Sequence, residues 1–531
     1  MKSNVPVIRC RKISESRQIA NDCPGGQSLL RRLLNGIICF LVLGTLILLD
    51  SAHAQDAQKA FTDTTPYKIL KGKVERKDYH TYIEKPFTLP EGVKRLRVEF
   101  FYTGKEQRTT IDIGIMDPAR FRGWSGGSRN VMTISAEDAT PGYLPGALPG
   151  GRWKLLLGIP NIREKVVAEY EARIYIETKT GITEFSDKPI CAEAGWYRGD
   201  LHMHSGNSDG KCTSQSGKEV PCPVCRIVET ATDKGLNFIA LTDHNTISQA
   251  DALRELQPAF DKILLVPGRE ITTFYGHANI FGLTDFIDFR MTNPSYAAAK
   301  NWMSAVNNSG GIISINHPGI PSGENCMGCG WQIENIPDKV ITAVEVLNGS
   351  SMKYSIEGPI EGWDQWHKML NSGQHVTAIG GSDDHHSETI GTPATVIYMK
   401  ELSVQGLIDG IRSGRVFIDI EGNKNHFLDL SATNKENRDE YMGGTLKVKP
   451  SDTINLTAYV KGVSGGKIEF IIDGKLNSKL NRELLSDNEK IQVKWQTDDN
   501  RHSIYIKVRD KEEKLVLVGN PIYIESAATT P

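Results

Sequence analysis

Short apolar segments alternate with helix-like stretches through the middle of this chain, and that alternation limits the folds that the chain can adopt. The predicted strands are Asp200–His204, Phe238–Thr242, Ile263–Pro267, Ala278–Gly282, Gly311–Ile315, Ala343–Leu347 and Val376–Gly380. The predicted helices are Val224–Lys234, Ser248–Phe260, Pro294–Asn308, Trp363–Ser372 and Val404–Ser413. Because strands that alternate with helices usually form a parallel sheet or a barrel, we predict an α/β fold for this region.

Histidine and carboxylate side chains follow most of these predicted strands, and nine of the 13 histidines lie between His202 and His386. The candidate metal ligands are His202, His204, Asp209, His244, Glu270, His277, His317, Asp383 and His385. Imidazole and carboxylate groups hold catalytic divalent cations, and the carboxyl ends of barrel strands meet at one mouth. Each motif alone fits a turn, a cap or a solvated loop, but together they predict a metal site. We interpret His367 and His375 as structural.

Both flanking regions, residues 60–190 and 440–527, alternate apolar and polar residues over short runs. Examples are Lys94–Phe100 and Ile468–Ile472, and Gly/Pro-rich turns separate such runs. This period of two predicts an antiparallel β-sandwich in each region, Ig-like at the C-terminus. Neither region contains a catalytic constellation, so we expect a stabilising role, with carbohydrate or surface binding as the alternative.

Residues 1–54 have the pattern of a secretory signal peptide. Arg31 and Arg32 precede the apolar run Leu33–Leu49, and a small-x-small motif predicts cleavage after Ala54. An uncleaved membrane anchor is the alternative, because the run is long for a signal peptide. We therefore expect a periplasmic or secreted protein with no stable membrane span after cleavage.

The charge balance argues against a nucleic-acid partner. The whole chain has 62 basic and 64 acidic side chains, and residues 1–54 contain seven and three of these. The mature protein would therefore have 55 basic and 61 acidic side chains, a net charge of −6. A mildly acidic protein does not attract a polyanion, so we expect a small-molecule partner.

Six cysteines follow the predicted signal peptide: Cys191, Cys212, Cys222, Cys225, Cys326 and Cys329. Two pairs, Cys222–Cys225 and Cys326–Cys329, have the C-x-x-C spacing that favours a structural zinc in a cytosolic protein. In an oxidising compartment an even number of cysteines favours disulfides, which we predict here. The sequence does not choose among the possible pairings.

The histidine motifs resemble those of the PHP (polymerase and histidinol phosphatase) metallohydrolases. The matching motifs are Gly199–Ser205, Ser208–Gly210, Ala240–Asn245, Gly268–Glu270, Asn316–Pro318 and Gly381–His385. An exported chain with β-rich regions on both sides is similar to the branch named for carbaryl hydrolase. The resemblance implies a distorted (β/α)7 barrel over residues 195–425, which agrees with the seven strands predicted above.

The resemblance also implies two or three divalent ions, of zinc, manganese or iron. The implied ligand groups are His202, His204, Glu270 and Asp383; His277 and His317, bridged by Glu270; and Asp209, His244 and His385. Such ions lower the pKa of a bridging water, so that hydroxide is available near neutral pH. The implied chemistry is direct attack of a metal-bridged hydroxide on an ester.

Side chains next to these ligands are candidates for other catalytic roles. Asp243, Asp384 and His386 are candidate proton donors to the leaving group. Arg269 and Arg198 are candidates for binding an anionic substrate, although a structural ion pair would explain either of them.

The sequence therefore predicts an exported metal-dependent hydrolase that acts on a small-molecule ester, with a phosphoester as the leading substrate. The alternative enzyme is a carboxyl-ester or carbamate hydrolase, because attack on phosphorus and on a carbonyl requires the same hydroxide. The alternative from another class is a non-catalytic protein that binds a glycan or a surface and keeps a vestigial metal site. The oligomeric state cannot be predicted.

Overall fold

The computed structural model of the protein describes residues 65–526 except residues 128 and 325. The predicted signal peptide lies outside these residues. The described chain forms two units, one of residues 65–180 and 186–188 and the other of residues 181–185 and 189–526. Within the described residues, no helix combines the length and the apolar character needed to cross a membrane.

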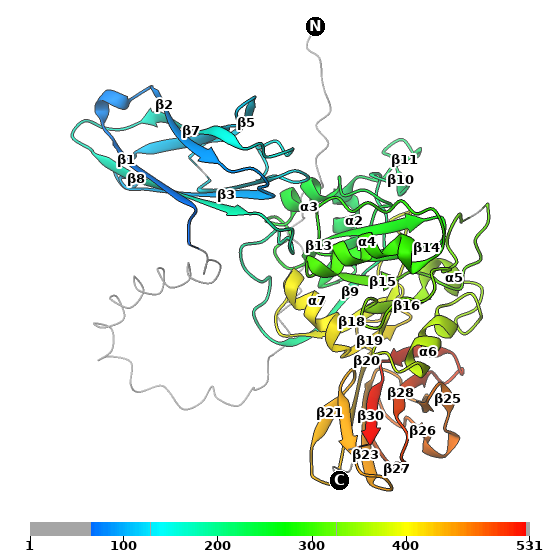
Figure 1. The fold of residues 1–531 in the computed structure, drawn as a ribbon. Helices are drawn as coiled ribbons and strands as arrows, with labels where there is room; N and C mark the ends of the chain where they lie inside the picture. The colour runs from blue at the N-terminus through cyan, green and yellow to red at the C-terminus, as the bar shows by residue number, and fades with distance from the viewer. Residues whose placement is uncertain (1–64, 128, 325, 527–531) are drawn as a thin grey trace, which may run out of the picture. The chain divides into compact units, whose positions relative to one another are not determined.

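Two four-stranded antiparallel sheets form the N-terminal unit, with strand orders β1-β8-β3-β6 and β2-β7-β4-β5 (Figure 1). The elements are β1 Lys68–Val74, η1 Arg76–Asp78, β2 Tyr82–Leu89, β3 Arg95–Tyr102, β4 Thr110–Met116, β5 Phe121–Ser125, β6 Val131–Ser135, β7 Gly151–Asn161 and β8 Ala168–Glu177. Alternate residues of each strand face one core. Phe100 of the first sheet and Trp153 of the second are both buried in it.

The central region is mixed α/β, as predicted. Its strands are β9 Gly195–Asp200, β12 Phe238–Leu241, β13 Leu264–Thr273, β14 Gly276–Phe281, β15 Ile312–Ile315, β16 Ala343–Asn348, β17 Thr377–Gly381, β18 Ala394–Met399 and β19 Val416–Asp419. They lie in one sheet in the order β17-β16-β15-β14-β13-β12-β9-β18-β19. A separate hairpin pairs β10 (Lys211–Thr213) with β11 (Glu219–Pro221).

The five predicted helices are present between these strands, and α5 is a further short helix that was not predicted. Their bounds are α2 Val224–Asp233, α3 Ala250–Leu256, α4 Tyr296–Asn308, α5 Gly349–Met352, α6 Trp363–Asn371 and α7 Val404–Ser413. The Ser403 side chain caps α7 by accepting from the Gly406 backbone N–H, and Gly414 ends it with a φ of 70°. These local signals explain why α7 has the bounds predicted from the sequence.

One predicted strand is displaced. Strand β9 ends at Asp200, so most of the predicted strand Asp200–His204 lies in the loop beyond it. The buried Asp200 carboxylate accepts hydrogen bonds from the backbone N–H groups of His202 (3.1 Å) and Gly391 (2.6 Å). These bonds replace ladder pairing and turn the chain out of the sheet.

The central sheet is not purely parallel, contrary to the expectation from strand–helix alternation. Strand β12 runs parallel to β9 and β13, but β14 is antiparallel to both β13 and β15. Only Phe274 and Tyr275 separate β13 from β14, which is too short for the crossover that parallel strands need. The resulting hairpin pairs Thr272 with His277 and brings a histidine opposite the carboxyl end of β13.

The same sheet continues into the C-terminal region, because β29 pairs antiparallel with β19. The C-terminal elements are β20 Phe427–Thr433, β21 Asp439–Tyr441, β22 Thr445–Val448, β23 Thr453–Lys461, β24 Lys467–Ile472, β25 Lys475–Leu476, η2 Ser478–Leu480, β26 Arg482–Glu483, β27 Asn488–Gln496, β28 His502–Arg509, β29 Leu515–Gly519 and β30 Ile522–Ser526. A second sheet has the order β21-β20-β23-β27. Buried residues of both sheets share one core.

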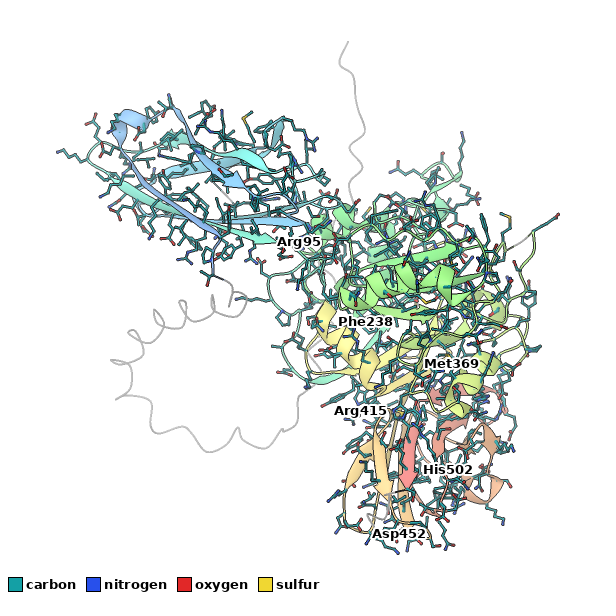
Figure 2. All side chains as sticks on the ribbon, viewed as in Figure 1. Arg95, Phe238, Met369, Arg415, Asp452 and His502 are labelled. Carbon is teal, nitrogen blue, oxygen red and sulfur yellow. A yellow bond between two sulfur atoms is a disulfide. The ribbon has the colours of Figure 1, made fainter. Side chains whose placement is uncertain are left out.

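Arg415, labelled in Figure 2, joins the central and C-terminal regions. Its guanidinium lies over the rings of Tyr398 of β18 (4.2 Å) and Tyr441 of β21 (4.0 Å). It also donates a hydrogen bond to Asp429 of β20. Contacts of a cation with two aromatic faces and a carboxylate are stabilising when partly buried.

Candidate metal centre

The carboxylate of Glu270 lies at the centre of a buried histidine cluster. Glu270 is in β13 and its side chain is fully buried. The ring nitrogens around it are those of His244 (2.7 Å), His277 (3.3 Å), His317 (3.3 Å), His202 (3.5 Å) and His204 (3.7 Å). A single carboxylate thus contacts five rings that come from four separate places in the sequence.

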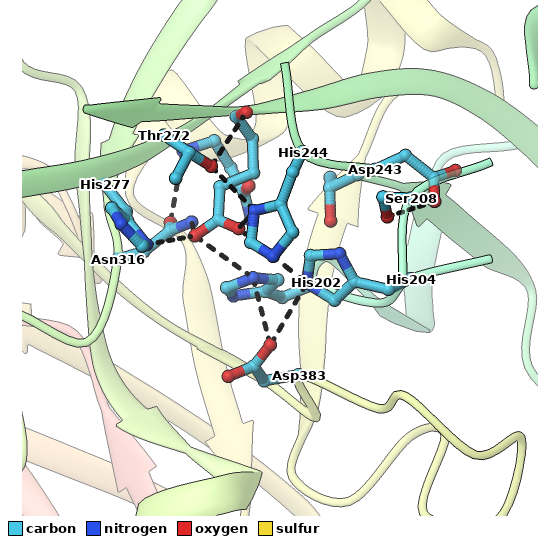
Figure 3. Close-up of polar contacts among 12 residues, drawn as sticks. His202, His204, Ser208, Asp243, His244, Thr272, His277, Asn316 and Asp383 are labelled. Atoms are coloured by element: carbon cyan, nitrogen blue, oxygen red, sulfur yellow. Dashed lines mark hydrogen bonds and ion pairs between the residues drawn. The ribbon is translucent and has the colours of Figure 1, made fainter. Parts of the chain in front are cut away.

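Two further carboxylates extend this cluster. Asp383 Oδ1 lies 3.1 Å from His204 Nε2, and His202 Nε2 is 3.4 Å away. Asp209 lies 3.5 Å from His385 Nε2, and the distance from Asp209 to His244 Nε2 is 3.6 Å. The structure therefore brings all nine predicted ligands together, and Figure 3 labels His202, His204, His244, His277 and Asp383 among them.

Four groups of side chains offer ligand atoms within 4.8 Å of one another. They are His202, His204 and Glu270; His204, Asp209, His244 and His385; His277, His317 and Cys329; and His202, His317 and Glu345. The first three overlap with the three implied groups. They differ because His204 is shared, Asp383 is absent from all of them, and Cys329 takes the place of Glu270 beside His277 and His317. Nitrogen and oxygen ligands of this kind suit zinc, manganese or iron.

The outer nitrogens of several rings are held by hydrogen-bond acceptors. His202 Nδ1 lies 3.0 Å from Glu345 Oε1, and His277 Nε2 lies 3.2 Å from the backbone oxygen of Met327. The outer nitrogen of His385 meets a backbone oxygen in the same way. Because carboxylate and carbonyl oxygens only accept, each outer nitrogen carries the hydrogen, and the other nitrogen is left with a lone pair.

The inward nitrogens lack partners. His202 Nε2, His204 Nδ1, His277 Nδ1 and His317 Nδ1 are buried and have no hydrogen-bond partner. Buried polar atoms are nearly always satisfied, and leaving one unpaired costs about 1–3 kcal/mol. Two of them, His202 Nε2 and His277 Nδ1, face the Glu270 carboxylate, so they fit a divalent cation, which would accept their lone pairs.

Two ligands have unusual backbone geometry. His317 has a φ of 27° and Asp383 a φ of 51°, both in the region that side-chain-bearing residues seldom occupy. Hydrogen bonds fix each of them, from the His317 N–H to Glu345 (3.0 Å) and from the Asp383 N–H to the His202 backbone oxygen (2.8 Å). Strained backbone that is held by its surroundings is typical of functional sites.

Charge within the cluster changes how its members titrate. Burial opposes ionisation of Glu270, but His202 and His277 outweigh it and hold the pKa of Glu270 well below its usual value. Burial disfavours a charged His385, yet the hydrogen bond with Asp209 and the charge of Asp383 raise its pKa to about 9. The same carboxylates raise the pKa of His202, His244 and His317 against the effect of burial, whereas burial lowers the pKa of His204.

We predict that the metal-free protein loses stability as the pH rises from about 6.5 to about 9. A histidine whose pKa is raised on folding stabilises the folded state fully below the pKa of the unfolded chain, and this stabilisation is lost above the pKa of the folded state. His385 therefore contributes roughly 2 kcal/mol at acidic pH, which is lost at alkaline pH. Melting of the chelator-treated protein at pH 6, 7.5 and 9 would measure this. His385→Gln should flatten the dependence, and a melting temperature that rises with pH would contradict the explanation.

Glu345, which the sequence analysis did not single out, supports two of the ligands. Its buried carboxylate in β16 accepts from His202 Nδ1 (3.0 Å), the His317 backbone N–H (3.0 Å) and the Asn348 side chain (3.1 Å). One signal could have found it. A carboxylate in the middle of the apolar strand Ala343–Leu347 is unusual unless it has a buried partner.

Replacing Glu345 with glutamine should weaken metal binding by about 10–100-fold, because such outer partners orient the ligands and raise their basicity. Competition with a coloured chelator measures the affinity. Glu469→Gln is a matched control, since Glu469 is a buried carboxylate paired with Arg509 in the C-terminal sheet. Equal affinities in the two variants would show that Glu345 does not support the site.

Asp243 and Asp384, which are predicted as proton donors, instead accept hydrogen bonds from the loops that carry the ligands. The Asp243 carboxylate accepts from the Ser205 backbone and hydroxyl (2.8 Å each) and from the Ser208 hydroxyl (2.7 Å). Asp384 accepts from backbone N–H groups between His386 and Thr389 and from the Thr389 hydroxyl (2.5 Å). These contacts position the loops that carry Asp209 and His385.

The other predicted catalytic residues make contacts of a structural kind. Arg269 precedes Glu270 on β13, so it faces the opposite side of the strand, and its buried guanidinium donates to the Asp285 backbone oxygen (2.6 Å). Arg198 forms an ion pair with the buried Asp419. The side chain of His386 is exposed.

The two histidines interpreted as structural lie against the C-terminal strands. His367 Nε2 is 2.9 Å from the Tyr505 hydroxyl, and the His375 ring stacks on Tyr523 with a centroid distance of 3.6 Å. Neither appears among the groups of side chains that could share an ion.

Comparison with known proteins adds no relative. No family model matches the sequence, and no curated protein matches it. The assignment to a family therefore depends on the motifs of the sequence, and the chemistry must be argued from the cluster itself.

Proposed function

We propose that the protein is a divalent-metal-dependent hydrolase of ester bonds, with phosphoesters as its leading substrates and a PHP-type distorted barrel as its catalytic domain. The observation that carries this proposal is the set of unpaired, inward-facing ring nitrogens around Glu270. Divalent ions bound there would polarise the ester oxygen and make water acidic enough to attack near neutral pH.

The residues around the cluster support this role by fixing its geometry. The Asn316 amide donates to Glu270 Oε1 (2.9 Å), and His244 Nδ1 lies 2.6 Å from the Thr272 hydroxyl. The Asn348 amide donates to Asp383 Oδ2 (3.3 Å). Ligands that are held before the substrate arrives need little rearrangement during the reaction.

A panel of four esters tests the proposal on the metal-loaded full chain. We expect faster turnover of p-nitrophenyl phosphate or bis-p-nitrophenyl phosphate than of p-nitrophenyl acetate and 1-naphthyl methylcarbamate. His202→Ala should abolish the activity because it removes an inward nitrogen. An inactive protein with a full metal complement would overturn the proposal.

A carboxyl-ester or carbamate hydrolase is the second candidate, and exposed apolar residues near the ligands favour it. Phe274 and Met327 are 76% and 72% exposed. Phe274 lies in the hairpin of His277, and Met327 contacts His277 through its backbone oxygen. Apolar side chains of this kind suit an aromatic leaving group, so higher turnover of the carbamate would select this candidate.

Lys211 offers a way to separate the two candidates. Its backbone N–H donates to the His385 backbone oxygen (2.6 Å), and its exposed ammonium pairs with Glu219 (2.8 Å). If the substrate is anionic, Lys211→Ala should lower kcat/KM by about three- to fivefold. Turnover of neutral p-nitrophenyl acetate should not change. Lys218→Ala, in the same exposed segment, is the control, and equal effects on both substrates would contradict a role in anion binding.

We also propose that the protein is exported to the periplasm or secreted. The disulfide between Cys326 and Cys329 supports this location, because disulfides persist in oxidising compartments. In the described part of the chain, Cys212, Cys222 and Cys225 form no disulfide, so the disulfide prediction is wrong for these three. N-terminal sequencing of the mature protein tests the location, since cleavage after Ala54 would leave Gln55 as the first residue.

A further inference from the structure

The C-x-x-C loop that follows His317 places a sulfur atom beside two of the candidate ligands. Cys329 is fully buried, and its sulfur lies within 4.8 Å of ring nitrogens of both His277 and His317. Cys329 is bonded to Cys326, which is only partly buried. The sequence motifs that predict the metal site do not include this cysteine.

The backbone holds this loop against the hairpin that carries His277. The Gln332 N–H donates to the Tyr275 backbone oxygen (2.9 Å), and the His277 ring donates to the Met327 backbone oxygen (3.2 Å). Gly328 lies so close to Thr273 that a Cβ atom would be 2.1 Å from the Thr273 oxygen. These contacts involve neither sulfur, so they remain when the disulfide is opened.

We propose that reduction of this disulfide makes Cys329 a third ligand of the metal position formed by His277 and His317. The inference rests on the proposed metal site and adds a redox-dependent member to it. His277 Nδ1 and His317 Nδ1 are both buried and unpaired, so the position already offers two nitrogen lone pairs. A thiolate completes a set of two imidazoles and one sulfur. Such a set binds zinc in preference to a harder ion such as manganese.

The reductant is a dithiol. Its thiolate attacks the more accessible sulfur, that of Cys326, and the Cys326–Cys329 bond breaks with Cys329 as the leaving thiolate. The second thiol of the reductant then displaces Cys326 from the mixed disulfide, and the reductant leaves as its own disulfide. Two electrons pass to the protein, Cys326 takes a proton from the reductant, and Cys329 keeps its negative charge as a metal ligand.

Cobalt substitution of the full-length mature protein tests this proposal without an activity assay. Visible ligand-field bands report bound Co²⁺ whatever its ligands, whereas a near-ultraviolet charge-transfer band appears only with thiolate ligation. We expect the charge-transfer band in dithiothreitol-reduced protein and its absence from the oxidised protein. Zinc should displace the cobalt less readily from the oxidised form, where the sulfur is not a ligand.

Two serine variants form a matched pair, because each removes the disulfide but only one leaves a thiol beside the histidines. Cys326→Ser should show the charge-transfer band without reductant, and Cys329→Ser should lack it even with reductant. The reduced protein and Cys326→Ser could both show visible bands but no charge-transfer band. That result would overturn this inference but leave the metal site intact. A charge-transfer band in Cys329→Ser would assign ligation to another thiol and also overturn it. Absence of all cobalt bands would overturn the proposed function as well.

Discussion

Replacing Glu270 with glutamine is expected to lower the hydrolysis rate by roughly a thousandfold, which corresponds to ~4 kcal/mol of transition-state stabilisation. Glu270 contacts ring nitrogens of five histidines, so its carboxylate is the group shared by most of the candidate ligands. An amide has nearly the same shape but no negative charge, and its NH₂ group cannot bind a cation. We expect both the rate and the amount of bound metal to fall.

Elemental analysis and initial rates on the same sample separate the two effects. The Glu469→Gln variant controls for loss of a buried carboxylate, and it should keep full metal content and activity. A Glu270→Gln variant with normal metal content and normal rate would show that this carboxylate does not organise the site.

Removing the metal should lower the melting temperature of the protein by roughly 10 °C or more. Each ion present at a hundredfold excess over its Kd stabilises the folded state by about 2.7 kcal/mol, so two or three ions contribute about 5–8 kcal/mol. The effect is large here because four buried ring nitrogens have no partner within the protein. Without a cation, the unprotonated nitrogens remain buried without a partner, and an unsatisfied buried polar atom opposes folding.

Calorimetry with and without chelator measures this shift. His204→Ala should reduce it, because His204 belongs to two of the candidate ligand groups. His375→Ala should keep the full shift, since His375 stacks on Tyr523 outside those groups. A melting temperature that does not depend on metal would contradict binding at the cluster.

Local sequence signals predicted the individual elements well, as α7 shows. Its Ser403 cap and its Gly414 stop lie within a few residues of the helix that they define. Pairing direction was harder, because it depends on the length of a connection and not on the strand itself. The predicted strand ended at Pro267, whereas β13 continues to Thr273, so the two-residue link to β14 could not be recognised from the predicted bounds.

The candidate site could be predicted where its residues are of a type and in a motif that indicate metal binding. Histidines in conspicuous motifs were identified, and the structure brings them together. Glu345 was missed because a single carboxylate in an apolar strand does not by itself indicate a functional residue. Its role depends on partners that only the structure shows. Cys329 was noticed only as half of a C-x-x-C pair, because its distance from His277 and His317 depends on how two loops fold against each other.

The pairing of β19 with β29 has a consequence for the size of the part of the chain that can hold the candidate metal centre. A chain ended near residue 425 would leave β19 with one unpaired side and with the hydrophobic Phe417 and Ile418 near that open edge. Unpaired sheet edges of this kind associate with one another and drive aggregation. The C-terminal strands therefore act as a permanent edge cover, and the smallest soluble form of the protein should extend through β30.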